Sequence, residues 1–147
     1  MAGTQDAITA ARFAITIDGS EIASFSELQG ITTQVDVVDF IESSDKEVIM
    51  KKLPGKRTPP TVMLKRGKNS SMELWAWHEA VLMGDMALAR KSCSLVMFDV
   101  GGKAVARYHL EHAWPSKIEI GALKAGASEV LMESVTIVCE HIQRVAP

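Results

Sequence analysis

An alternating stretch that runs into Trp114 and Pro115 constrains the fold of this chain more than any other feature. Polar and apolar side chains alternate from Lys103 to Glu111, which is the period-two pattern of a half-buried β-strand. Because proline lacks a backbone N–H donor, we expect Pro115 to end the ladder and to form a rigid structural corner with Trp114. One face of the strand carries Ala104, Ala106, Tyr108 and Leu110, and the other carries Lys103, Arg107, His109 and Glu111.

Similar segments, separated by turn signals such as Asp18-Gly19 and Gly101-Gly102, occur along most of the chain. They predict a mainly β fold, a β-sandwich or barrel of seven or eight antiparallel strands with one packed helix. The expected strands cover residues 13–17, 22–28, 31–41, 61–66, 92–100, 103–112, 117–120 and 129–142.

A single helix is expected at about residues 71–83. Apolar side chains recur there at i, i+3, i+4, i+7 and i+8, which gives one stripe that packs on a sheet, and Gly84 supplies a stop. The stripe consists of Leu74, Trp77, His78, Val81 and Leu82.

The bulk properties fit one domain, residues 1–147, in which residues 1–11 are expected to be a flexible or interface N-terminus. With 47% hydrophobic and 23% charged residues, the composition is that of a soluble globular protein. No apolar run approaches the roughly 20 residues of a spanning helix, and the first residues do not resemble a secretory signal. We therefore expect synthesis and residence in the cytoplasm without membrane insertion, and buried, reduced thiols at Cys93 and Cys139.

A long arm between two strands, residues 43–58, is predicted from the turn-forming residues crowded between Glu42 and Pro60. Basic residues gather in the same region: eight of them lie between Lys46 and Lys68 against one acid. That segment therefore carries a formal charge of +7, which leaves −9 for the remainder of a chain whose net charge is −2. The asymmetry is compatible with an anionic ligand, with attraction between copies of the chain, or with a solvated basic loop.

Residue patterns typical of catalysis or metal binding are not present, so no catalytic, cofactor-binding or metal-binding residues are predicted. His109 and His112 are three apart on a strand and face opposite sides, which prevents them from converging on a metal. No GxSxG elbow presents a nucleophile. The tryptophans are expected to be core or interface anchors.

Six short segments, in order, resemble the tail tube proteins of contractile phages and of phage-tail-like contractile injection systems. The resemblance extends from about residue 13 to residue 144. It rests on Phe13–Gly19, Phe25–Gly30, Lys52–Lys56, Leu64–Gly67, Ala113–Lys117 and Glu133–Ile137, with a tryptophan-bearing helix at Leu74–Trp77.

This resemblance implies a structural subunit of the inner tube, with six subunits in a ring and rings stacked into a hollow channel for DNA or effector cargo. The implied partners are other copies of the chain, a contractile sheath protein, baseplate and tube-initiating proteins, and a tape-measure protein or cargo in the lumen. The particle would be a phage tail, a tailocin, or an extracellular or intracellular injection system, and release from the cell is left open among these. Inter-ring contacts are expected at Lys46, Lys51, Lys52, Lys56 and Arg57, and lumen-facing positions at Thr33, Gln34, Asp36, Asp39 and Lys65.

The alternative hypothesis is a small β-barrel ligand-binding module or an enzyme accessory subunit. Polar groups spread along strand faces, rather than gathered at one pocket, favour the tube. The resemblance applies equally to phage tails, tailocins and injection systems, and equally to a main tube subunit and a baseplate-proximal paralogue.

Overall fold

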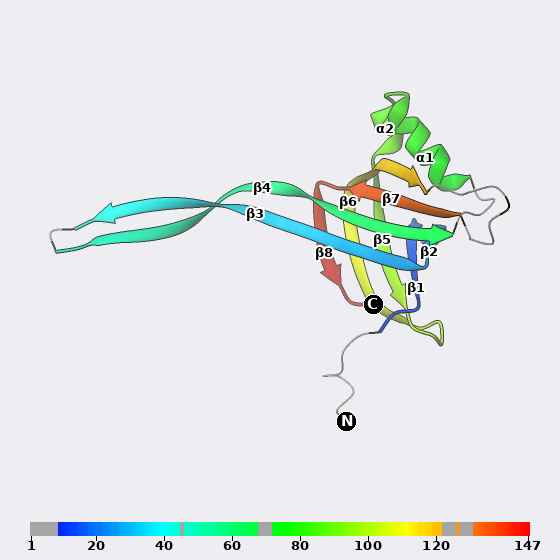
Figure 1. The fold of residues 1–147 in the computed structure, drawn as a ribbon, viewed down its shortest axis with the longest axis horizontal. Coiled ribbons are helices and arrows are strands. Elements are labelled where there is room, and N and C mark those ends of the chain that lie inside the picture. The colour runs from blue at the N-terminus through cyan, green and yellow to red at the C-terminus, as the bar shows by residue number, and fades with distance from the viewer. Residues whose placement is uncertain (1–8, 45, 68–71, 122–125, 127–130) are drawn as a thin grey trace.

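The computed structural model describes residues 9–44, 46–67, 72–121, 126 and 131–147, and it is mainly β (Figure 1). Eight strands and two short helices follow one another along the chain, so the predicted fold class is confirmed. The strands are β1 (Arg12–Ile17), β2 (Ser20–Phe25), β3 (Glu27–Ser43), β4 (Val48–Gly67), β5 (Lys91–Phe98), β6 (Ala104–Ile120), β7 (Met132–Val138) and β8 (His141–Val145), and the helices are α1 (Glu73–Leu82) and α2 (Met86–Ala89).

All strand pairs are antiparallel and form one sheet in the order β2-β1-β5-β6-β7-β4-β3, with β8 paired to β6. The sheet is not closed by a ladder between its end strands β2 and β3. It folds over a common core, to which β1 and β5 contribute Ile15 and Leu95, and β4 and β7 contribute Leu64 and Ile137. The architecture is therefore a folded open sheet rather than a closed barrel.

Strand β6 bends and belongs to both halves of this sheet. Its first part pairs with β5 and β8, and from Trp114 onward it pairs with β7. His112 has a φ of +52° immediately before the change of partner. The prediction that Pro115 ends the ladder is wrong: Pro115 pairs with Ile137, and the strand continues to Ile120. A register shift between Pro115 and Lys117 accommodates the missing donor.

The helix predicted at 71–83 is observed as α1, Glu73–Leu82, with Leu74, Trp77 and His78 buried. Leu82, predicted to lie on the packed stripe, is instead 66% exposed. The short helix α2 was not predicted; it begins at Asp85, whose carboxylate accepts a hydrogen bond from the backbone N–H of Leu88. The Trp77 indole N–H donates to the carbonyl of Ala89, which holds α2 against α1.

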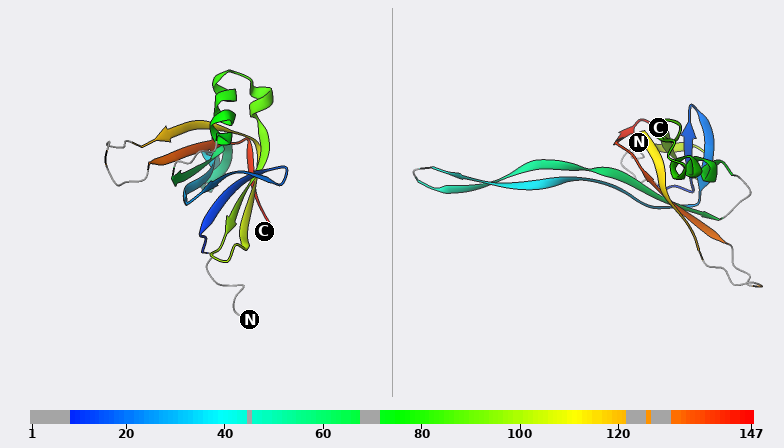
Figure 2. Two further views of the ribbon diagram at one scale, coloured as in Figure 1. Left: turned by 90° about the vertical axis from the view of Figure 1, so that its right-hand side faces the viewer. Right: turned by 90° about the horizontal axis from the view of Figure 1, so that it is seen from above.

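The predicted arm is a hairpin that projects from the body of the molecule (Figures 1 and 2). Strands β3 and β4 form its two sides and are separated only by residues 44–47, so most of the segment expected as arm 43–58 is strand. Beyond Thr61 towards the tip, β4 pairs only with β3 among the described residues. Pro54, Pro59 and Pro60 are tolerated there because an edge strand can lack outward-facing donors.

Candidate assembly surfaces

Four strands in one half of the sheet form a unit with two open edges. The order is β3, β4, β7 and the second part of β6, and each strand is antiparallel to its neighbour. Within the described chain, β3 has no strand partner beyond β4, and Trp114–Ile120 has no strand partner beyond β7, although the Pro115 carbonyl accepts a hydrogen bond from His78. Such edges present unpaired N–H and C=O groups that can accept another strand.

One face of this four-stranded unit packs on the core. Cross-strand partners form apolar rows on that face because directly opposed residues point the same way. Val62, Leu64, Val135 and Ile137 are at most 1% exposed. The rows are Leu28–Leu64–Val135–Ile118 and Ile31–Val62–Ile137–Pro115.

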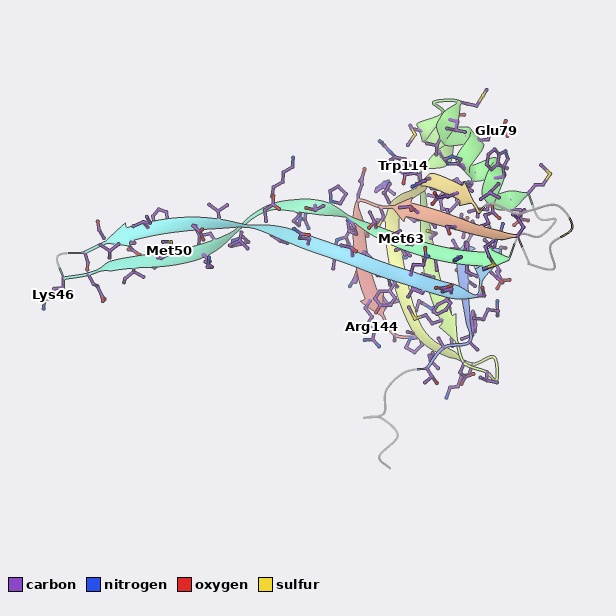
Figure 3. The ribbon with its side chains drawn as sticks, viewed as in Figure 1. Lys46, Met50, Met63, Glu79, Trp114 and Arg144 are labelled. Carbon is purple, nitrogen blue, oxygen red and sulfur yellow. The ribbon has the colours of Figure 1, made fainter. Side chains whose placement is uncertain are left out.

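The other face of the unit is mostly polar. Met63, which is 44% exposed, is its large apolar side chain near the centre (Figure 3). Two cross-strand rows on this face carry two acidic residues and two lysines, so the charges of these rows balance. These rows are Glu27–Lys65–Ser134–Glu119 and Gly30–Met63–Thr136–Lys117.

Of the predicted lumen-facing residues, Lys65 lies on this polar face, opposite Glu27 and Ser134. The other four, Thr33, Gln34, Asp36 and Asp39, lie on β3 where it leaves the body and along the arm. Sequence reasoning missed five further polar residues of these two rows, although the alternation of β7 contained the signal for two of them. The missed residues are Glu27, Ser134, Thr136, Lys117 and Glu119.

All five predicted inter-ring residues lie on the arm, and Figure 3 shows Lys46 at its end. Lys52 Nζ lies 2.9 Å from Asp39 Oδ1, and Lys51 pairs with Glu42, so two of the cations are neutralised by the opposite strand. The arm as a whole has no net charge, because residues 35–57 contain equal numbers of acidic and basic residues. They are Asp36, Asp39, Glu42, Asp45 and Glu47 against Lys46, Lys51, Lys52, Lys56 and Arg57.

The region around the predicted corner is held by α1. The ring Nδ1 of His78 lies 2.9 Å from the carbonyl oxygen of Pro115 and donates a hydrogen bond to it. Pro115 is fully buried, whereas Trp114 is half-buried on the polar face, opposite Val138. The point at which β6 changes partner is therefore fixed from the helical side of the molecule (Figure 3).

A buried ion pair joins β4 to β7. Arg66 Nε lies 3.3 Å from Glu133 Oε2, and the two side chains are 5% and 7% exposed. The Arg66 guanidinium also lies over the Phe25 ring, 5.4 Å from its centroid. This contact ties the end of β2 to the four-stranded unit.

Two of the grooves on the described part of the chain open to the surface. A groove of about 440 Å³ runs between the β1–β2 hairpin and the helices, past Ile22 and Trp77. Another, of about 330 Å³, lies at the root of the arm between Arg57 and His141. No group of three or more His, Cys, Asp or Glu side chains that could hold a metal ion occurs among the residues described.

Both cysteines are reduced and buried. Burial, and to a smaller extent the neighbouring Cys139, raises the pKa of Cys93 to about 12, and burial raises the pKa of Cys139 to about 11. These thiols therefore lack nucleophilic character near neutral pH. In the part of the chain that the structure covers, no helix is long and apolar enough to cross a membrane.

Solved structures similar to this chain share its fold at low sequence identity. The sheath–tube complex of the PVC extracellular contractile injection system in the extended state matches with a TM-score of 0.80 and 15% identity, over 99% of this chain and 96% of the other. The tube-terminating cap of the anti-feeding prophage matches with a TM-score of 0.71 and 18% identity over 100% of both chains. The virion of a gene transfer agent matches with a TM-score of 0.60 and 11% identity, over 91% of this chain and 95% of the other.

A search of curated protein sequences finds no match. In contrast, the sequence family described as T4-like virus tail tube protein gp19 matches residues 9–143, which is most of the chain. This match confirms the family resemblance that the sequence segments predicted. The chain therefore belongs to the T4-like virus tail tube protein gp19 family.

Proposed function

We propose that this chain is the inner tube subunit of a contractile tail or injection system, and that six copies close into a ring through the four-stranded unit. The observation that carries the proposal is the pair of open edges at β3 and at the second part of β6. Across four antiparallel strands the two edges run in opposite directions. When β6 of one copy lies beside β3 of the next, the antiparallel pattern continues without a break.

Closure of six such units would give a barrel of 24 strands, four from each copy. Barrels of about 16–18 strands already enclose a water-filled channel. The polar face would line the channel, because the apolar face is occupied by the core. The balanced charges of Glu27, Lys65, Lys117 and Glu119 would hold neither a polyanion nor a polycation strongly, which suits passage of DNA or effector cargo.

Stacking of rings is proposed to involve the arm, including Lys46, Lys51, Lys52, Lys56 and Arg57. We also propose that four residues of β3 face the lumen where this strand extends beyond the body. They are Thr33, Gln34, Asp36 and Asp39. A contractile sheath, baseplate and tube-initiating proteins, and a tape-measure protein or cargo are the proposed partners. Assembly is proposed to occur in the cytoplasm, and the subunit is proposed to have no enzymatic role.

The alternative of a ligand-binding barrel is not favoured. Its binding site would lie inside the sheet, where Ile15, Leu64 and Leu95 are fully buried against one another. The cavities described above open to the surface instead.

Negative-stain electron microscopy of the purified chain, over a range of protein and salt concentrations, tests the proposal. We expect sixfold rings or hollow tubes with a central channel. Sedimentation in the same buffers gives the mass of the particles. A chain that stays monomeric at every concentration, also when a baseplate fraction from its source is added as a nucleus, would contradict it.

A further inference from the structure

The polar face of the four-stranded unit carries a third cross-strand row, nearer the arm than the two rows described above. Thr61 and Val138 of this row lie two residues from Met63 and Thr136 of the neighbouring row, so the two rows point to the same side of the sheet. The first two rows carry two acids and two lysines, whereas the third carries no charge. Its four members are Thr32 on β3, Thr61 on β4, Val138 on β7 and Trp114 on β6.

Three apolar side chains come together where the third row meets the second (Figure 3). Val138 lies directly opposite Trp114, and Met63 is the diagonal neighbour of Val138 in the ladder between β4 and β7. Diagonal neighbours are about 7–8 Å apart, which is within reach of long and aromatic side chains. Met63 is 44% exposed, and Val138 and Trp114 are half-buried. We call these three residues the apolar patch.

The apolar patch is not part of the core. Along the same strands, Val62 and Ile137 point to the opposite face and are fully buried, so the unit is packed without the patch. Apolar side chains gathered on an otherwise polar surface indicate contact with another molecule. The patch of one copy is small, and its effect therefore depends on repetition.

The ring of the proposed function repeats the apolar patch. Because the polar face would line the channel, six copies would place six patches at one level along it. The charged residues Glu27, Lys65 and Glu119 lie in the row farthest from the arm, and Lys117 lies in the row of Met63. The channel of each ring would therefore have a zone of balanced charge next to a belt formed by the six patches, which we call the apolar belt.

We propose that the apolar belt binds an unfolded or extended polypeptide through its apolar side chains, and that the channel therefore carries protein rather than nucleic acid. This inference rests on the proposed function and narrows it to one class of cargo. The binding site is the patch of Met63, Val138 and Trp114, repeated around the channel.

A nucleic acid would require a different surface. Duplex DNA presents its phosphates outward, and its affinity for a protein depends on lysine and arginine side chains. Single strands combine base stacking with a positively charged groove. Trp114 offers an aromatic ring, but the three rows have no net positive charge to accompany it. The backbone of a polypeptide is neutral, so apolar contacts can hold it without such charge.

Weak and repeated contacts suit a cargo that must also move. Each copy contributes only three partly exposed side chains, so one site alone binds weakly. Stacked rings would repeat the apolar belt along the axis and hold a long chain by many contacts at once. Because the sites are identical, the chain can advance from one ring to the next without a net change in binding free energy, as conduction through a channel requires.

Fluorescence anisotropy with a matched pair of labelled peptides tests the proposal. One peptide consists of leucine, serine and glycine, and in the other every leucine is replaced by asparagine. A labelled oligothymidine and a labelled DNA duplex of similar length are the nucleic-acid probes. Met63→Gln removes the apolar group with little change in side-chain length, and Met83→Gln, at a position 79% exposed after α1, is the matched control. Every sample is also imaged by electron microscopy.

We expect rings of the parent and of Met83→Gln to bind the leucine peptide at least tenfold more tightly than the asparagine peptide or either nucleic acid. Rings of Met63→Gln should bind the leucine peptide at least threefold more weakly than the parent. Rings that bind both peptides equally, that prefer a nucleic acid, or that are insensitive to Met63→Gln would overturn the inference and leave the proposed function standing. Loss of rings in Met63→Gln alone would assign the residue to contacts between copies and would also overturn it. Absence of rings from every sample would contradict both.

A second measurement locates the bound peptide. The leucine peptide is made with a photoreactive benzophenone group, illuminated with the rings, and the attachment points are identified by mass spectrometry. We expect attachment mainly to the segments of β4, β7 and β6 that contain Met63, Val138 and Trp114. Attachment mainly to the groove between the β1–β2 hairpin and the helices, next to Ile22 and Trp77, would overturn the inference.

Discussion

The Nδ1–H of His78 on α1 donates a hydrogen bond to the carbonyl oxygen of Pro115, 2.9 Å away on β6, one residue after that strand begins to pair with β7. Both residues are buried. The helix thereby fixes the position at which the two halves of the sheet separate. Removing the donor would leave a buried carbonyl oxygen without a partner.

His78→Ala should therefore lower the free energy of unfolding by about 1–3 kcal/mol, because the carbonyl of Pro115 stays buried and unsatisfied. His78→Asn, whose side-chain amide can donate from a similar position, should recover part of the loss. Urea titrations of the three proteins provide the comparison. An equal loss in both variants would show that ring packing, rather than the hydrogen bond, matters at this site.

The buried ion pair of Arg66 and Glu133 gives a second prediction. Arg66→Met leaves an uncompensated carboxylate in the interior and should cost about 3–5 kcal/mol. The double variant Arg66→Met with Glu133→Leu should be more stable than Arg66→Met alone. Chemical denaturation of both single variants and the double variant measures the coupling, and strict additivity of the losses would contradict it.

The third prediction concerns the pairing of the two strands of the arm at Gly55. A Cβ atom at this position would lie 2.8 Å from Val38 Cγ2 across the hairpin. Gly55→Val should disturb the ladder of the arm and abolish tube formation, while the thermal unfolding of the body stays within a few degrees of the parent. Gly55→Ala with Val38→Ala removes the obstructing methyl group and should restore assembly in part. Hydrogen exchange of β3 and β4 locates the change, and fast exchange that extends to β5 would contradict it.

The thiols predict how stability depends on alkaline pH. The folded state raises the pKa of Cys93 to about 12 and of Cys139 to about 11, above the ordinary value of 9.0, so the unfolded chain loses these protons first. Stability should thus be unaffected by the thiols below about pH 9 and fall above it, by up to about 1.4 kcal/mol per pH unit for each thiol. Cys93→Ala should show a shallower decline between pH 9 and 11 in urea titrations, whatever its stability at pH 7, and an unchanged slope would contradict the assignment.

Much of the body could be predicted from periodicity alone. The alternation of β6 and β7 and the apolar run of β5 predicted strands that the structure contains, since each is packed on a core that its own pattern reveals. Helix α1 followed from the spacing of Leu74, Trp77 and His78. These elements have one strongly apolar face, and local pattern and tertiary packing agree for them.

The arm and the bend were harder to predict for two different reasons. Prolines and Gly55 indicate a loop when read locally, yet β4 accommodates them because its outer edge is unpaired in the arm, a property of the sheet rather than of the segment. At the bend, His112 adopts a positive φ without being glycine, and nothing in its neighbours signals that.

The polar face was predicted only in part because it depends on register. Lys65 could be found from its own strand, but the rows that join it to Ser134 and Glu119 are set by pairing across β7 and β6. Shifts such as the one between Thr32 and Gln34 change which β3 residues share that face.

The arm makes the subunit directional. In a stack whose copies all point the same way, the arms project at one terminus of the polymer and the opposite side of the body is displayed at the other, so the two termini differ in chemistry even though every copy is identical. A capping protein and a nucleating protein could therefore each recognise a different end. The polymer is polar although it is built from one kind of chain.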